Sequence, residues 1–130
     1  ALILVKDIMV KGKAIPLISS NKSMKFAINI MTKKKMGMVC VKNKKNLISV
    51  CVDGDLRRHA NNLYKKNILD VATKNPNWVS DTDTALSAIN KMNSSGITSL
   101  LVTRRKDINK KIKKLVGVIH LHAALALGIK

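Results

Sequence analysis

The pentapeptide Ala27-Ile28-Asn29-Ile30-Met31 recurs sixty-one positions later as Ala88-Ile89-Asn90-Lys91-Met92. Around each copy, apolar residues fall at positions i, i+3, i+4 and i+7, counted from Met24 in the first copy and from Ala85 in the second. This spacing places the apolar side chains on one face of an α-helix. The sequence therefore predicts two equivalent amphipathic helices.

The similarity extends outward from these helices in both directions. Matching segments occur in the same order in both halves, which a chance match of one pentapeptide does not explain. The pairs are 5–9 with 68–72, 38–41 with 99–102, and 47–51 with 115–119. We therefore predict an internal duplication, with one repeat over residues 1–66 and a second over residues 67–130.

Each repeat has the same predicted order, β-α-β-β-α after a small leading helix. Short β-branched runs indicate strands, and turn-like polar stretches separate them. The predicted strands are 15–18, 38–41 and 47–52, then 77–80, 99–103 and 115–119; the second helices are 54–64 and 121–127. A unit this small cannot cover its own sheet. We expect an α/β (α+β) fold in which the two repeats pack face to face with pseudo-two-fold symmetry.

Two local features of the second repeat lead to further expectations. Asp81, Thr82 and Asp83 offer side-chain oxygens that can cap the helix that follows them. The connection 104–114 is longer than its counterpart in the first repeat and very basic. It is expected to form a mobile, exposed hairpin tip.

Composition excludes several classes of protein. The formal net charge is +18, but lysine carries most of it, with four arginines and one each of Phe, Trp and Tyr. Nucleic-acid readers favour the arginine fork and stacking aromatic rings, so we expect no nucleic-acid partner; a basic nucleic-acid-binding domain is kept as an alternative. No apolar run approaches the ~20 residues that span a bilayer, so no membrane partner is expected. Cys40 and Cys51 suggest reduced, buried thiols in a cytoplasmic protein.

From residue 5 to residue 128 the sequence resembles a tandem pair of cystathionine-β-synthase-type (CBS) domains. The duplicated order, the Asp-Ile-Met opening and the Ala-Ile-x-x-Met helix carry this resemblance. More specific stretches are Asp53-Gly54-Asp55-Leu56-Arg57-Arg58, Met36-Gly37-Met38, residues 97–99 and residues 117–122. These resemble the C-terminal CBS pair of bacterial D-arabinose-5-phosphate isomerases.

In that family an N-terminal sugar-isomerase (SIS) domain converts ribulose 5-phosphate to arabinose 5-phosphate for Kdo and lipopolysaccharide synthesis. Nothing here looks like that domain, so the resemblance implies that this stretch is not itself an enzyme. It implies a regulatory, ligand-sensing and oligomerising role, with a homodimer formed through the CBS pair and the SIS domain of the same chain as partners. The alternative is an adenylate-sensing CBS module of an unrelated enzyme or transporter.

The resemblance also implies a small phosphorylated ligand in a cleft between the repeats. The candidate contact residues are Ile15, Gly37, Met38, Val52, Asp53, Asp55, Arg58, Thr98, Ser99, His120 and His122. The usual signature places a Thr or Ser three residues before an Asp. Val52 stands at the hydroxyl position of the first repeat, and His120 with Ala123 replaces the signature in the second. A nucleotide-sugar resembling CMP-Kdo is therefore the expected effector, with an adenylate as the alternative.

The residues alone leave several roles open. Asp53 and Asp55 can accept sugar hydroxyls, hold a divalent ion or cap a helix. His120 and His122 are too few for a zinc site, so we expect no metal and no required cofactor. Walker, GxSxG and HExxH motifs are absent from the sequence, and we expect no catalytic residue in it.

Overall fold

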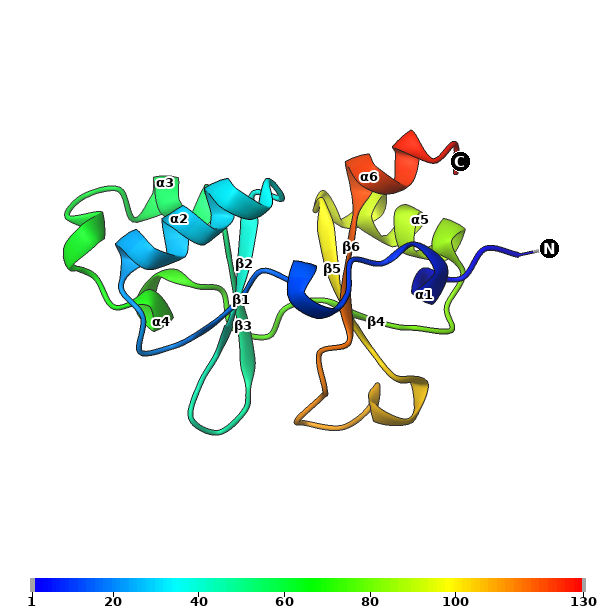
Figure 1. Ribbon diagram of the computed structural model, residues 1–130, viewed down its shortest axis with the longest axis horizontal. Coiled ribbons are helices and arrows are strands. Elements are labelled where there is room, and N and C mark those ends of the chain that lie inside the picture. Colours follow the sequence, from blue (N-terminus) through cyan, green and yellow to red (C-terminus); the bar gives the residue numbers. More distant parts are fainter. Residues whose placement is uncertain (1, 130) are drawn as a thin grey trace. The chain divides into compact units, whose positions relative to one another are not determined.

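The computed structural model describes residues 2–129 and contains two three-stranded sheets (Figure 1). The chain forms two compact units. The central unit comprises residues 16–76, and the terminal unit combines the segment before residue 16 with the segment from residue 77 onward. The α/β fold with tandem repeats is confirmed.

The central unit contains the first sheet, of strand order β1-β2-β3. β1 runs parallel to β2, and β2 runs antiparallel to β3. Its elements are β1 (Leu17–Ser19), α2 (Met24–Lys34), β2 (Met38–Lys42), β3 (Ile48–Val52), α3 (Asp53–Arg58), the 3-10 helix η2 (Leu63–Lys65) and α4 (Ile68–Val71).

The terminal unit repeats this arrangement with strand order β4-β5-β6, again parallel and then antiparallel. Helices α5 and α6 contact each other (Figure 1). Its elements are α1 (Val5–Ile8), η1 (Gly12–Ala14), β4 (Trp78–Ser80), α5 (Ala85–Ser95), β5 (Ser99–Thr103), η3 (Arg105–Asp107), β6 (Gly117–His120) and α6 (Leu121–Ala126).

The two long helices confirm the predicted repeat. Ser23 caps α2 by accepting a hydrogen bond from the Phe26 amide, and α5 has an equivalent cap in Thr84. The prediction that residues 81–83 cap α5 is wrong. The Asp83 carboxylate instead accepts from the Ser80 amide, 2.9 Å away, and so closes the turn before the helix.

The predicted helical faces supply the core of each unit. In the central unit, Met24, Ala27 and Met31 are buried against strand residues such as Val39 and Val41. In the terminal unit, Ala85, Ala88, Ile89 and Met92 are buried in the same way, together with Leu100, Val102 and Ile119. Each unit therefore has a hydrophobic core of its own.

The leading segment of each sequence repeat packs in the unit that contains the other repeat's sheet. Thr73, which follows α4, forms a β-bridge with Val50 of β3. At the equivalent place Val10, which follows α1, forms a β-bridge with Val118 of β6. The boundaries of the compact units therefore differ from those of the predicted repeats 1–66 and 67–130. The repeat boundaries describe the sequence duplication and stay a prediction.

Gly117 makes the second of these bridges possible. A Cβ atom at Gly117 would lie 2.4 Å from Met9 Sδ and 2.9 Å from the Val10 carbonyl oxygen. No side chain fits at such distances, so the backbone of β6 must be bare where the N-terminal segment crosses it.

Two other expectations need correction. The helix predicted over 54–64 ends at Arg58, because His59 leaves the helical conformation (φ −115°), and Asn62 then adopts a left-handed conformation (φ 56°) before η2. The connection 104–114 is not simply a mobile tip, because it contains η3 and buries the Asp107 carboxylate. Within residues 2–129, no helix is both long and apolar enough to cross a bilayer.

Candidate ligand-binding site

Six of the predicted site residues come together in the central unit, where β2 begins and β3 passes into α3. Met38 and Val52 are directly paired in the sheet. The Asp53 amide donates to the Gly37 carbonyl oxygen at 3.3 Å. Gly37 has a φ of +65°, and a Cβ there would lie 3.1 Å from Asp53 Oδ2. Glycine therefore leaves the Asp53 carboxylate open beside the backbone.

Asp55 is buried, and both of its carboxylate oxygens accept hydrogen bonds from the chain. Its Oδ2 accepts from the Val52 amide at 2.9 Å, and its Oδ1 accepts from the Thr73 hydroxyl at 3.0 Å. Arg58 forms an ion pair with the same Oδ1. Only 2% of Asp55 is exposed. The arrangement joins α3, β3 and the segment after α4, which gives Asp55 a structural role.

Arg58 lies partly over the backbone at the start of α3. A Cβ at Gly54 would be 3.2 Å from one of the terminal guanidinium nitrogens, so a bare backbone makes room for the side chain. Although Arg58 is paired with Asp55, 63% of its side chain is exposed. The outward-facing donors of the guanidinium can therefore receive an anion bidentately.

Asp53 has the opposite character from Asp55. It is exposed, and its carboxylate forms no hydrogen bond or ion pair with any residue of the described chain. An ionised carboxylate is a hydrogen-bond acceptor only. Asp53 is therefore the free acceptor of this group and Arg58 is its donor, a combination that suits a sugar hydroxyl next to a phosphate.

Four further predicted residues come together at the equivalent place in the terminal unit. The Leu121 amide donates to the Thr98 carbonyl oxygen at 2.8 Å, as Asp53 does to Gly37. Ser99 is paired with His120 across β5 and β6. The rings of His120 and His122 lie 5.4 Å apart, centroid to centroid. This group contains two imidazoles, and it has Leu121 and Ala123 at the positions aligned with Asp53 and Asp55.

Ile15 is the remaining predicted residue. It is half-buried and ends η1, immediately before the Pro16 carbonyl that accepts from the Cys40 amide at 2.7 Å. Its role as a ligand contact stays a prediction, as do the roles of the other ten residues.

Thr73 was not among the site residues predicted from the sequence. Its hydroxyl is one of the three donors to Asp55. A comparison of the repeats contains the signal: Thr73 aligns with Val10, and Asp55 aligns with Ala123. The polar pair of one unit thus corresponds to an apolar pair in the other. Among residues 2–129, no three His, Cys, Asp or Glu side chains are grouped so as to hold a metal ion.

Comparison with solved structures identifies the fold. The CBS domain pair of protein MJ0100, in complex with 5-methylthioadenosine and S-adenosyl-L-methionine, superposes with a TM-score of 0.80. The alignment covers 98% of this chain and 97% of that one, at 20% identity. The chain has the fold of a CBS domain pair. Residues 68–128 also match the family model of the CBS domain.

Sequence relatives of this CBS pair align along nearly its whole length. An uncharacterized protein of Rickettsia prowazekii is 35% identical over 127 residues, which is 96% of this chain. Arabinose 5-phosphate isomerase KdsD is 30% identical in Francisella tularensis and 32% identical in Yersinia pestis, over 97% and 98% of this chain. The chain spans 38% of the length of each of these three relatives.

Proposed function

We propose that this CBS pair is the regulatory, ligand-sensing part of an arabinose-5-phosphate isomerase and binds a nucleotide-sugar. The observation that supports this most directly is the exposed Asp53 carboxylate beside Gly37. The largely exposed guanidinium of Arg58 belongs to the same short helix. An acceptor for sugar hydroxyls thus lies near a donor for phosphate.

Similarity to relatives supports the assignment to an isomerase. The alignment with KdsD of Francisella tularensis and Yersinia pestis covers nearly all of this chain but 38% of those proteins. In this proposal an SIS domain of the same chain performs the isomerisation, and the CBS pair forms the homodimer contact in the cytoplasm. Ligand binding shifts the attached domain between states only by its differential affinity for them.

Asp55 is the residue at which a usual CBS adenosine site would accept ribose hydroxyls. Here three donors already occupy its carboxylate. Releasing it to a ligand would leave the Val52 amide and the Thr73 hydroxyl without their acceptor, which costs about 1–3 kcal/mol. We therefore assign hydroxyl recognition to Asp53, and this favours a ligand other than a plain adenylate.

Adenylate sensing is the second candidate function. It is favoured by structural relatives that contain such ligands: one is CBSX2 in complex with AMP (TM-score 0.75, 19% identity), and another is the CBS domain of a bacterial CNNM/CorC family Mg²⁺ transporter in complex with ATP (TM-score 0.74, 14% identity).

Thermal unfolding of the chain with AMP, ADP, ATP, CMP or CMP-Kdo separates the two functions. A ligand present at 100 times its Kd stabilises by about 2.7 kcal/mol, which raises Tm by several degrees. A rise with CMP-Kdo supports the proposal, whereas a rise with adenylates alone supports the second function. Asp53→Asn should abolish the CMP-Kdo response, and Asp70→Asn, the same change at an exposed carboxylate of α4, should preserve it.

A further inference from the structure

Residues 104–114, which form most of the connection between β5 and β6, are the most basic part of the chain. They contain seven lysines and arginines and a single acidic residue, a formal charge of +6. We call this segment the basic tip. The corresponding connection in the central unit, between β2 and β3, is shorter.

A buried carboxylate holds the basic tip together. Asp107 is 3% exposed, and its Oδ2 accepts from Arg104 Nε at 2.9 Å. Lys110 Nζ lies 2.8 Å from the other carboxylate oxygen. Lys113 closes the following turn by donating to the Lys110 carbonyl oxygen at 2.6 Å. The tip is therefore an ordered loop built around one negative charge.

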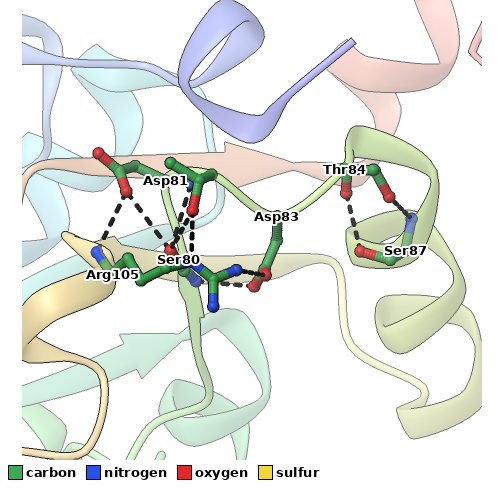
Figure 2. A network of polar contacts seen from close by, with 7 residues as sticks. Ser80, Asp81, Asp83, Thr84, Ser87 and Arg105 are labelled. Carbon is green, nitrogen blue, oxygen red and sulfur yellow. Dashed lines mark hydrogen bonds and ion pairs between the residues drawn. The ribbon is translucent and has the colours of Figure 1, made fainter. Parts of the chain in front are cut away.

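Arg105 fastens the basic tip to the turn before α5 (Figure 2). Its Nε donates to Thr82 Oγ1 at 2.7 Å, and its guanidinium is paired with Asp83 at 3.2 Å. Its backbone amide donates to Asp81 Oδ1 at 3.2 Å. Side chain and main chain thus anchor the same residue to one turn, which fixes the direction in which the tip projects.

Three lysines of the basic tip have no hydrogen-bond or ion-pair partner in the described part of the chain. Lys106, Lys111 and Lys114 are exposed and form no hydrogen bond or ion pair within the described chain. Ile112, which is 51% exposed, lies among them in the sequence. One ordered loop thus carries three exposed ammonium groups and an exposed apolar side chain.

We propose that the basic tip is a peripheral docking surface for an anionic lipid membrane. The sequence prediction of no membrane partner rested on the absence of a spanning segment, and a peripheral contact needs none. Charge complementarity carries the proposal, because lysines near an anionic leaflet each contribute about 1 kcal/mol, or about fivefold in partitioning. Ile112 can enter the boundary between headgroups and acyl chains.

The side-chain chemistry favours lipid over nucleic acid. The two arginines of the tip are engaged by Asp107 and by the turn before α5. The free cations are lysines, which act as point charges and lack the planar fork that grips bases and phosphates. The Trp78 ring already has a lysine of the tip over it, with Lys113 Nζ 5.9 Å from the ring centroid. Stacking platforms for bases are thus not offered by the tip.

Vesicle cosedimentation tests the proposal, with one set made of phosphatidylcholine alone and another of phosphatidylcholine with phosphatidylglycerol. The chain should bind the vesicles that contain phosphatidylglycerol and should not bind those of phosphatidylcholine alone. The binding should weaken at high salt. Replacing Lys106, Lys111 and Lys114 by Gln should lower partitioning by about 100-fold. Ile112→Asn should lower it about fivefold without changing the charge.

The matched control replaces Lys25, Lys33 and Lys65, exposed lysines of the central unit, by Gln. It removes the same charge from the total of +18 and should leave at least a tenth of the partitioning. Equal losses in the two triple variants would show that net charge alone acts, which overturns the proposal. So would no binding to anionic vesicles, or tighter, tip-dependent binding to RNA or DNA at the same salt. Unchanged circular dichroism spectra establish that the variants are folded.

Discussion

The Thr73 hydroxyl donates a hydrogen bond of 3.0 Å to the buried Asp55 carboxylate, across eighteen residues of chain. This bond fastens the segment after α4 to the start of α3. At the aligned positions the terminal unit has Val10 and Ala123, so it lacks this hydrogen-bonded polar pair.

Replacing Asp55 should destabilise the chain even without ligand. Asp55→Ala leaves the Val52 amide and the Thr73 hydroxyl without their acceptor, and we expect a loss of about 2–3 kcal/mol in the free energy of unfolding. Thr73→Val should cost about 1 kcal/mol. The double variant, which copies the apolar pair of the terminal unit, should lose less than the sum of the two. Urea unfolding measures all three, and strict additivity would contradict the coupling.

Gly117→Ala should also destabilise the chain, by about 1–3 kcal/mol, because the new methyl group overlaps Met9 and the Val10 carbonyl. Adding Met9→Ala should restore part of this loss, since it removes the side-chain overlap and leaves the backbone overlap. Thermal unfolding of the two variants, with Met9→Ala as the control, checks the prediction. An unchanged Tm for Gly117→Ala would show that the N-terminal segment does not cross β6 so closely.

The two cysteines should react slowly with thiol reagents and should not form a disulfide with each other. Burial raises the pKa of the Cys40 thiol from 9.0 to about 12. Burial, and then the charges of Asp55 and Asp53, raise the pKa of Cys51 to about 12 as well. Cys40 pairs with Val50 and Cys51 with Val39, so the two side chains point to opposite faces of the sheet.

At pH 8 the folded chain should therefore react with a thiol reagent about a thousandfold more slowly than the urea-unfolded chain. The sign of the pH effect follows from the raised pKa values. The contribution of the two protonated thiols to the free energy of unfolding is complete below pH 9. It is lost as pH rises toward 12, because the thiols of the unfolded chain ionise first. Rapid labelling of both thiols in the native state, or a disulfide between them, would contradict this arrangement.

The basic tip should loosen in acid. The hydrogen bond from Lys110, and then Arg104, holds the pKa of Asp107 below its usual value of 3.8. The contribution of the ionised Asp107 carboxylate to the stability of the tip is present above pH 3.8. It disappears as pH falls through the lower pKa of the folded state. Amide hydrogen exchange of residues 104–114 should therefore lose protection below about pH 4 after correction for intrinsic rates. In Asp107→Asn the protection should be low at every pH, and a steep acid transition in that variant would assign the effect to another group.

The sequence by itself determined the duplication, the two amphipathic helices and the six strands, because these follow from periodicity and from the order of matching segments. The sequence also placed Gly37, Val52 and Asp53 at strand ends that lie together in the structure, because their positions follow from the strand order. Their roles as ligand contacts stay a prediction. How the two repeats pack against each other stays a prediction.

The tertiary structure alone decided which carboxylate is free. Asp53 and Asp55 are two residues apart and chemically identical, but long-range packing brings the Thr73 hydroxyl to Asp55, whereas no residue among 2–129 forms a hydrogen bond or ion pair with the Asp53 carboxylate. It also decided that the leading segment of each repeat packs in the unit that contains the other repeat's sheet, and that the basic tip is organised around Asp107. Local sequence patterns report periodicity and capping, whereas these features depend on contacts between residues far apart in the chain.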